Sequence, residues 1–253
     1  METIEIHLDC VDSTQEYAKK NYLSFPDNKI TCITANQQTM GKGSLQKKWV
    51  SPIGNLYATF YFQLPLPVKY LTTLAQVMAS SCTSVLLNQK LNPKMKWPND
   101  IQLNQKKVAG ILCETIFNKD SIYLFLGIGI NVNMEADELS QIDQPSTSLK
   151  EETKLTWNIK KLLKQLQVQF EKDLELFIKE AYEPFRKKLN TILAFKGETV
   201  HCIEGQTEWI GLCDSLSKEG GLNLLLENNR GQSTSPTVYT LTQGRLIFRE
   251  KSL

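Results

Sequence analysis

Residues 122–130 read Ile-Tyr-Leu-Phe-Leu-Gly-Ile-Gly-Ile, a stretch without a charged side chain. A strand that is covered on both faces of its sheet has such a continuous apolar pattern, whereas a half-exposed strand alternates apolar and polar residues. We therefore expect this stretch to be the buried central strand of a β-sheet. It is too short to span a bilayer.

Strand and helix patterns surround this stretch. Further strands are expected at residues 2–8 (an edge strand), 30–35, 55–63, 94–103 and 107–117. Helices are expected from Asp12 onward, over about residues 68–90, and over residues 157–182 with Pro184 as the stop. Ser13 and Glu16 have the spacing of a capping box at the first of these helices. The polar stretches Thr39–Lys48 and Pro145–Lys154 are expected to be loops, the first of them mobile.

The C-terminal part has a different pattern. Short apolar segments, at Val200, Trp209–Leu212, Leu222–Leu226 and Leu246–Phe248, alternate with glycines, which is typical of a small all-β unit. The expected fold class is therefore α/β (α+β). A mixed β-sheet domain flanked by helices is expected at residues 1–190, and a small SH3-like β-barrel domain at residues 191–253.

The composition excludes several classes of protein. A net charge of +2 over 253 residues is too small for the basic bias of a nucleic-acid-binding protein. The six cysteines include no CxxC pair and there are two histidines, so neither a disulfide framework nor a cysteine or histidine metal site is expected. Residues 1–8 lack the apolar core of a signal peptide, and we expect a cytoplasmic protein.

Four polar segments each have a structural and a functional interpretation. Asp12–Gln15 caps a helix, or its hydroxyls bind a polar ring. Gly41–Ser44 is a surface turn, or a lid whose amides and lysine close over phosphates, although it is not a Walker A loop. In the structural interpretation, Lys96–Asp100 consists of a core tryptophan followed by a turn, and Lys107 is a solvated lysine. In the functional interpretation, Lys96–Asp100 and Lys107 belong to one site, where the small residues after Lys107 leave room for a ligand. Gly127–Asn131 indicates close packing or a ligand contact at a strand end.

In this order and at this spacing, the segments resemble the catalytic domain of bacterial biotin–protein ligases. The resemblance covers roughly residues 8–135 and rests on five motifs, which read here as Asp12-Ser-Thr-Gln15; Gln38-Thr-Met-Gly-Lys-Gly-Ser44 before Trp49-Val-Ser-Pro52; Lys96-Trp-Pro-Asn-Asp100; Lys107-Val-Ala-Gly-Ile-Leu-Cys-Glu114; and Gly127-Ile-Gly-Ile-Asn131. The family pattern has asparagine at Gln15, arginine at Lys42 and Ser44, and glycine at Gln46. The form it resembles lacks an N-terminal DNA-binding domain, because the first strand is expected to begin at residue 2.

The resemblance implies a two-step reaction. The biotin carboxylate attacks the α-phosphorus of ATP, which gives biotinyl-5′-adenylate and pyrophosphate, and a lysine of a carrier protein then displaces AMP. Lys107 and Lys42 are the implied catalytic cations, and Asp100 would orient the attacking amine and take up its proton. The implied biotin-binding residues are Ser13, Thr14, Gln15, Gln38, Gly41 and Gly110. The implied ATP- or adenylate-binding residues are Lys42, Gly43, Ser44, Trp97 and Asn131.

The implied partners are ATP and biotin as substrates, Mg²⁺ with the ATP, and the biotin carboxyl carrier protein of acetyl-CoA carboxylase. Neither DNA nor a membrane is an expected partner, and the chain is expected to be a monomer or a homodimer, with no metal ligands assigned. Two alternatives stay open: a lipoate or octanoate ligase or transferase of the same fold, and a non-catalytic biotin-binding protein. Because serine grips phosphate less firmly than arginine, Ser44 predicts weaker retention of the adenylate, unless Lys47 or Lys48 compensates.

Overall fold

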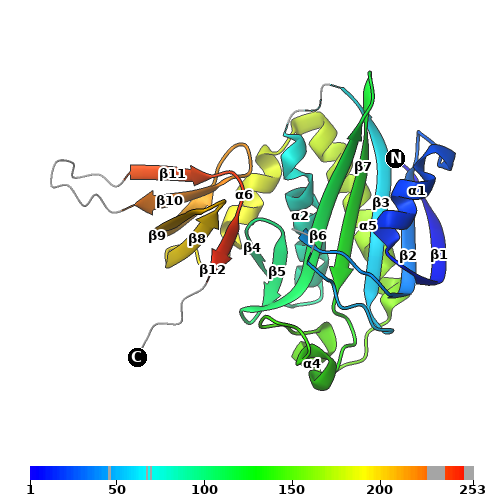
Figure 1. The fold of residues 1–253 in the computed structure, drawn as a ribbon, viewed down its shortest axis with the longest axis horizontal. Helices are drawn as coiled ribbons and strands as arrows, with labels where there is room; N and C mark the ends of the chain where they lie inside the picture. Colours follow the sequence, from blue (N-terminus) through cyan, green and yellow to red (C-terminus); the bar gives the residue numbers. More distant parts are fainter. Residues whose placement is uncertain (45–46, 67, 69, 227–236, 248–253) are drawn as a thin grey trace.

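Seven strands form the larger of two sheets in the computed structural model, which describes residues 1–44, 47–66, 68, 70–226 and 237–247 (Figure 1). In spatial order these strands are β1 (Thr3–Val11), β2 (Ile30–Gln38), β3 (Leu56–Pro65), β7 (Ser121–Ile130), β6 (Lys106–Phe117), β5 (Asp100–Leu103) and β4 (Lys94–Lys96). β1 pairs in parallel with β2, and the other neighbours are antiparallel. The sheet is therefore mixed and has β1 at an edge, as predicted.

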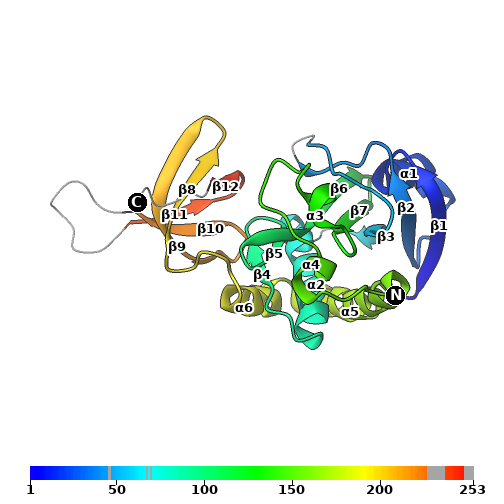
Figure 2. The ribbon, with the colours of Figure 1, turned by 90° about the horizontal axis from the view of Figure 1, so that it is seen from below.

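β7 is the central strand of this sheet, as its apolar run predicts. Its even-numbered side chains, from Ile122 to Ile130, are buried in the main core together with residues of α2 (Leu74–Asn88) and α5 (Ile159–Glu180). On the opposite face Phe125 packs with Tyr61 and with Ala18 of α1 (Thr14–Asn21). Figure 2 shows α2 and α5 on one side of the sheet and α1 on the other. Cover on both faces explains why the strand carries no charge.

The smaller sheet is antiparallel and five-stranded, which confirms the predicted SH3-like unit. Its strands in spatial order are β11 (Thr237–Leu241), β10 (Leu222–Leu226), β9 (Thr207–Leu216), β8 (Thr199–Glu204) and β12 (Arg245–Ile247). Helix α6 (Glu183–Thr191) connects the two sheets, which lie side by side (Figure 1). At their junction the Gly220 carbonyl accepts hydrogen bonds from Trp97 Nε1 (2.9 Å) and Gln76 Nε2 (2.7 Å).

Two predicted helices have different bounds in the structure. The helix expected from about residue 68 begins at Leu74, after a left-handed Tyr70 and the 3-10 turn η3 (Leu71–Thr73). The helix expected over 157–182 spans Ile159–Glu180 and ends at Ala181, whose φ is 58°. Pro184 therefore does not stop it. It lies in the first turn of α6, where its missing N–H would have no helical partner.

Two further local predictions were wrong. The expected strand 94–103 is divided into β4 and β5, because the chain reverses at Trp97–Asn99 and proline cannot donate to a ladder. The expected loop 145–154 contains α4 (Leu149–Thr153), which Ser148 caps by accepting a hydrogen bond from the amide of Glu151. Four short elements were not predicted: η1 (Tyr22–Ser24), η3, α3 (Ala136–Leu139) and α6.

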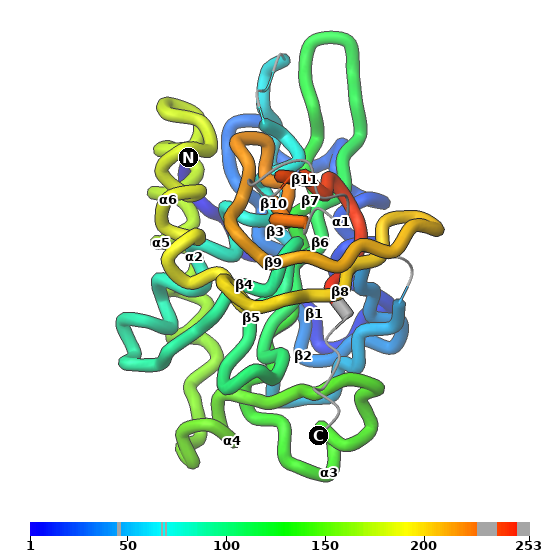
Figure 3. The backbone as a smooth tube through the Cα atoms, turned by 90° about the vertical axis from the view of Figure 1, so that its left-hand side faces the viewer, coloured from blue at the N-terminus to red at the C-terminus, as the bar shows by residue number. Residues whose placement is uncertain are grey.

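The β6–β7 hairpin extends beyond the neighbouring strands (Figure 3). Among the described residues, no helix is both long and apolar enough to cross a membrane. The family departure at Gln46 and the predicted strand end at Phe248 lie outside the described residues.

Candidate functional site

The face of β7 that carries Phe125 changes character toward the end of the strand, where its next two residues are Gly127 and Gly129. Paired residues of neighbouring strands have their side chains on the same face. The register therefore aligns one row across five strands: Tyr57, Gly129, Gly110, Asp100 and Lys96. Two glycines in the middle of this row leave a depression, with a phenol at one end and charges at the other.

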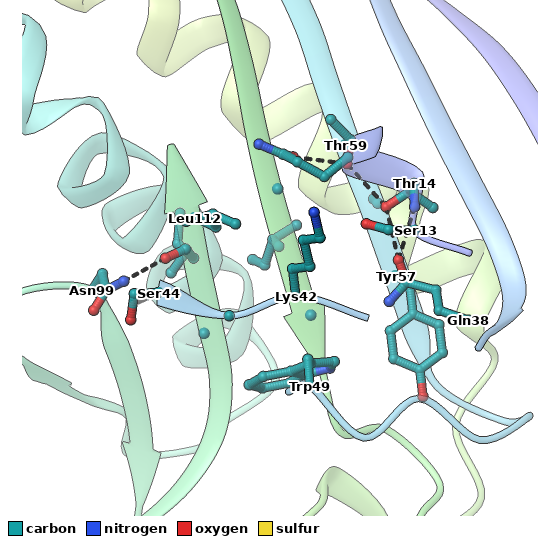
Figure 4. Close-up of a pocket in the computed structure, with 18 of the residues that line it drawn as sticks. Ser13, Thr14, Gln38, Lys42, Ser44, Trp49, Tyr57, Thr59, Asn99 and Leu112 are labelled. Atoms are coloured by element: carbon teal, nitrogen blue, oxygen red, sulfur yellow. Dashed lines mark hydrogen bonds between the residues drawn. The ribbon is translucent and has the colours of Figure 1, made fainter. Parts of the chain in front are cut away.

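A pocket lies over this row and is covered by the segment that follows β2 (Figure 4). Trp49 of that segment fills much of it. A Cβ atom added to Gly129 would lie 2.5 Å from Trp49 Cε2, and one added to Gly110 would lie 3.0 Å from Trp49 Cζ3. The remaining cavity volume is about 40 Å³, which is room for a few water molecules. A larger ligand therefore requires the Trp49 side chain to move.

One end of the pocket presents neutral hydrogen-bonding groups. Gln38 Oε1 accepts from the Thr14 amide (2.9 Å) and from Thr14 Oγ1 (3.2 Å). Thr59 Oγ1 lies 2.9 Å from Thr14 Oγ1 and 3.1 Å from Gln15 Oε1. Ser13, Thr14 and Gln15 are all buried. This end is therefore a fixed set of neutral donors and acceptors, which suits a polar, uncharged ring.

The predicted capping box at Ser13 and Glu16 is absent, because the Ser13 side chain makes no capping hydrogen bond. Gln38 of β2 supplies the acceptor for the Thr14 amide instead. The Glu16 side chain pairs with lysines. A partner distant in the sequence thus replaces the local cap, which leaves the Ser13 hydroxyl without a capping role.

The other end of the pocket is charged. Lys107 Nζ lies 2.7 Å from Asp100 Oδ1 and 5.1 Å from the centroid of the Trp49 ring. A β-bulge brings Lys107 to this face, because it pairs Lys107 with Gln102 instead of Leu103. Without that one-residue shift, Lys107 would point to the opposite face of the sheet. Next to the pair, the side-chain amide of Asn99 donates a hydrogen bond to the Ile111 carbonyl (2.5 Å) and thereby fixes the turn before Asp100.

Lys96 is a further cation at this end of the row. It is the cross-strand partner of Asp100. Burial lowers the pKa of Lys96 from its ordinary value, against the opposing influence of Asp100, and the positive charges of Lys107 and Lys47 lower it further. Two lysines therefore adjoin one carboxylate: Lys107 as its ion-pair partner and Lys96 as its cross-strand neighbour. This excess of positive charge favours anions at the charged end.

The segment that covers the pocket is a small hairpin in its described part. Gly43 N donates to Lys47 O (2.7 Å) and Trp49 N donates to Gly41 O (2.9 Å). The backbones of Lys42 and Lys48 form an isolated antiparallel β-bridge. The Lys42 side chain runs along the neutral end (Figure 4), and its Nζ lies 2.8 Å from Glu16 Oε1 on α1. Lys42, Gly43 and Ser44 all line the pocket.

The structure brings most of the predicted site residues together, but not all of them. Trp97 is buried beneath the smaller sheet and donates to Gly220, and Asn131 is buried and donates to the Thr147 carbonyl. Neither lines the pocket. Both contact partners that are distant in the sequence and that no local pattern marks. Gly41 is also outside the lining. It is packed against Ser51 and the Trp49 carbonyl, where an added Cβ would lie 2.5 and 2.6 Å away.

Several lining residues were not predicted. These are Trp49, Tyr57, Ala58, Thr59 and Asn99. Ile111 and Leu112 of the Lys107 motif, and Gly127, Ile128 and Gly129 of the segment for which a ligand contact was one interpretation, also line the pocket. Two signals could have identified some of them: Trp49 follows the glycine loop, and Asn99 lies within Lys96–Asp100. No local signal marks Tyr57 and Thr59, because only the register of β3 against β7 places them beside those glycines.

Three comparisons with known proteins agree on the family that this chain resembles. The family model described as the Biotin/lipoate A/B protein ligase family matches residues 7–131. The chain is 31% identical over 222 residues to the bifunctional ligase/repressor BirA of Escherichia coli (strain K12), an alignment that covers 86% of this chain and 68% of that protein. Its structure is similar to that of the biotin protein ligase from Aquifex aeolicus in complex with biotin and ATP, with a TM-score of 0.79, 31% identity, and coverage of 97% of this chain and 98% of that chain.

Proposed function

Because this chain belongs to the biotin protein ligases of the biotin/lipoate A/B protein ligase family, we propose that it activates biotin with ATP and transfers it to a lysine of a biotin carboxyl carrier protein. The observation that carries this proposal is the two-ended pocket. Neutral groups at Thr14, Gln38 and Thr59 suit the ureido ring of biotin, while the lysines around Asp100 suit its carboxylate and the phosphates of ATP.

In the first step, a biotin carboxylate oxygen attacks the α-phosphorus and the bond to the bridging oxygen breaks, so that pyrophosphate leaves. Both reactants are anionic. Two unit charges about 4 Å apart repel each other by roughly 4 kcal/mol at an effective dielectric constant near 20. Lys107 is the residue that we assign to hold both anions, since it lies at the charged end and is largely shielded from solvent. Lys42, Gly43 and Ser44 would contact the phosphates from the covering hairpin.

In the second step, a carrier lysine attacks the biotinyl carbonyl and AMP leaves. The attacking amine must lose a proton, although the pKa of a free lysine is about 10.4. Asp100 is the carboxylate that we assign to orient the amine and accept the proton. In the structure Asp100 pairs with Lys107. We therefore expect Lys107 to exchange this partner for the anionic substrate, which frees Asp100.

ATP is expected to enter with Mg²⁺. The described residues contain no cluster of three metal-ligating side chains, and Mg²⁺ on a nucleotide is usually held by phosphates with one or two carboxylates. Asp100 fits that role as a carboxylate of the pocket lining. Bound Mg²⁺ would neutralise phosphate charge.

The structure also supports proposals for the rest of the chain. We propose a catalytic unit at residues 1–190 and a small β-barrel unit at residues 191–253, with the buried contact between Trp97 and Gly220 at their junction. Ser13, Gln15 and Gly110 complete the proposed biotin site. Trp97, Asn131 and Gly41 are proposed to support this site from outside the lining.

The test is pyrophosphate exchange. The protein should exchange labelled pyrophosphate into ATP with biotin and not with lipoate or octanoate. Equal exchange with lipoate would assign the site to a lipoate ligase. Biotin binding without exchange would indicate a non-catalytic biotin-binding protein.

A further inference from the structure

Lys42 occupies an unexpected position for a phosphate-binding residue. Its amine is held by Glu16, in the first turn of α1, at an Nζ–Oε1 distance of 2.8 Å. Figure 4 shows the Lys42 amine on the side of Thr14 and Thr59, and away from Asn99. The amine is therefore directed away from the charged end.

Glu16 is itself part of a larger charge network. Its Oε1 atom also lies 2.7 Å from Lys19 Nζ, and Lys19 pairs with Glu114 Oε1 of β6 at 3.0 Å. Hydrogen bonds from Lys19 and then from Lys42 hold the pKa of Glu16 below its ordinary value. Glu16 thus remains a carboxylate at neutral pH, with Lys19 as its second partner on α1.

The pair connects the two walls of the pocket. Glu16 belongs to α1, whose first residues form the neutral end, and Lys42 belongs to the hairpin that also carries Trp49. The contact therefore joins the covering hairpin to α1. The Glu16 side chain is 22% exposed and that of Lys42 is 45% exposed, so salt can weaken the contact.

We propose that Glu16 is a positioning residue for Lys42, and that their ion pair is a latch that closes the hairpin over a ligand bound at the neutral end. The latch opens when polyphosphate binds, because the phosphates compete with the single Glu16 carboxylate for the Lys42 amine. This inference rests on the proposed function, in which the ureido ring of biotin binds at the neutral end and the phosphates of ATP bind at the charged end.

The latch predicts two effects of Glu16→Gln with opposite signs. Without ATP, biotin should dissociate about two- to fivefold faster, which is the scale for an exposed ion pair. The KM for ATP in biotin-dependent pyrophosphate exchange should fall by a similar factor, because the amine no longer has to leave a carboxylate. A substitution that merely loosened the fold would raise both the dissociation rate and KM.

The experiment is a chase of labelled biotin from the protein, with Glu114→Gln as the matched control. That control removes the same charge from the same network but does not contact Lys42. The unmodified protein should lose biotin faster as salt increases, and Glu16→Gln should respond less. The latch is disproved by equal dissociation rates in Glu16→Gln and the parent, by equal acceleration in both variants, or by a raised KM for ATP.

The outcomes for the latch and for the proposed function can be distinguished. Absence of biotin binding by the unmodified protein would refute the proposed function itself. Normal biotin binding with a dissociation rate that neither salt nor Glu16→Gln changes would refute only the latch. The biotin carboxylate also contributes to the salt response of the unmodified chain, so the variants decide the question. Glu16→Ala, measured in the same chase, replaces Glu16→Gln if that variant fails to fold.

Discussion

Replacing Lys107 by alanine is expected to slow adenylate formation by at least about 10²-fold, the scale for one preorganised electrostatic group. The structure supports a large value. The amine is fixed before substrate arrives, 2.7 Å from Asp100 and over the Trp49 ring, and the side chain is only 16% exposed. A shielded amine that is already held in the pocket stabilises developing phosphate charge better than a solvated one does.

The same substitution leaves Asp100 unpaired, so its effect on folding must be separated from its effect on catalysis. Breaking a fully buried pair costs about 3–5 kcal/mol, and an exposed pair contributes about 0–1 kcal/mol. Because Asp100 is 21% exposed, we expect an intermediate loss of about 1–3 kcal/mol. That loss is below the usual free energy of unfolding of about 5–15 kcal/mol, so the variant should remain folded.

The assay is single-turnover formation of adenylate from labelled ATP and saturating biotin, together with transfer from pre-formed adenylate to a carrier. Lys107→Ala should impair adenylate formation more than transfer, since the anions have already been joined in the second reaction. Lys106→Ala is the matched control, because Lys106 is the exposed neighbour on the same strand, and it should behave like the parent. Adenylate formation by Lys107→Ala at near the parent rate would refute the assignment.

Three further predictions concern other parts of the chain. Ser44→Arg should slow release of adenylate by about tenfold, because a charge-assisted bond to phosphate contributes roughly 1.5–3 kcal/mol; a chase of labelled adenylate measures this, and equal rates would show that another group retains it. Gly129→Ala should weaken biotin binding by about tenfold or more, because the added Cβ would occupy the floor of the pocket that the ligand has to enter; calorimetry with unchanged affinity would contradict this. Burial raises the pKa of Asp173, although Ser81 donates a hydrogen bond to its carboxylate. The stability that the protonated Asp173 contributes is therefore fully present below about pH 4, and it is lost as the pH rises through the raised pKa of the folded state. Asp173→Asn should therefore gain more stability relative to the parent at pH 7 than at pH 4 in urea unfolding, and an equal difference at both pH values would disprove the linkage.

The sequence by itself determined the elements whose burial is periodic. The uncharged run of residues 122–130 indicated a central strand because both of its faces are covered, and the spacing of the apolar residues in 157–182 indicated α5 within a few residues. It also identified both ends of the pocket, since Ser13, Thr14, Gln38, Asp100 and Lys107 belong to recognisable motifs.

Only the tertiary structure decided which of these groups meet. Lys107 reaches Asp100 because a bulge shifts its strand by one residue, and Trp97 leaves the pocket because its indole finds the Gly220 carbonyl in the other sheet. Likewise, Lys42 is held by Glu16 across the pocket. Local patterns report how often a side chain is buried. They do not specify the register of the strands or the path of a loop. Strand register and loop path determine which residues distant in the sequence come into contact.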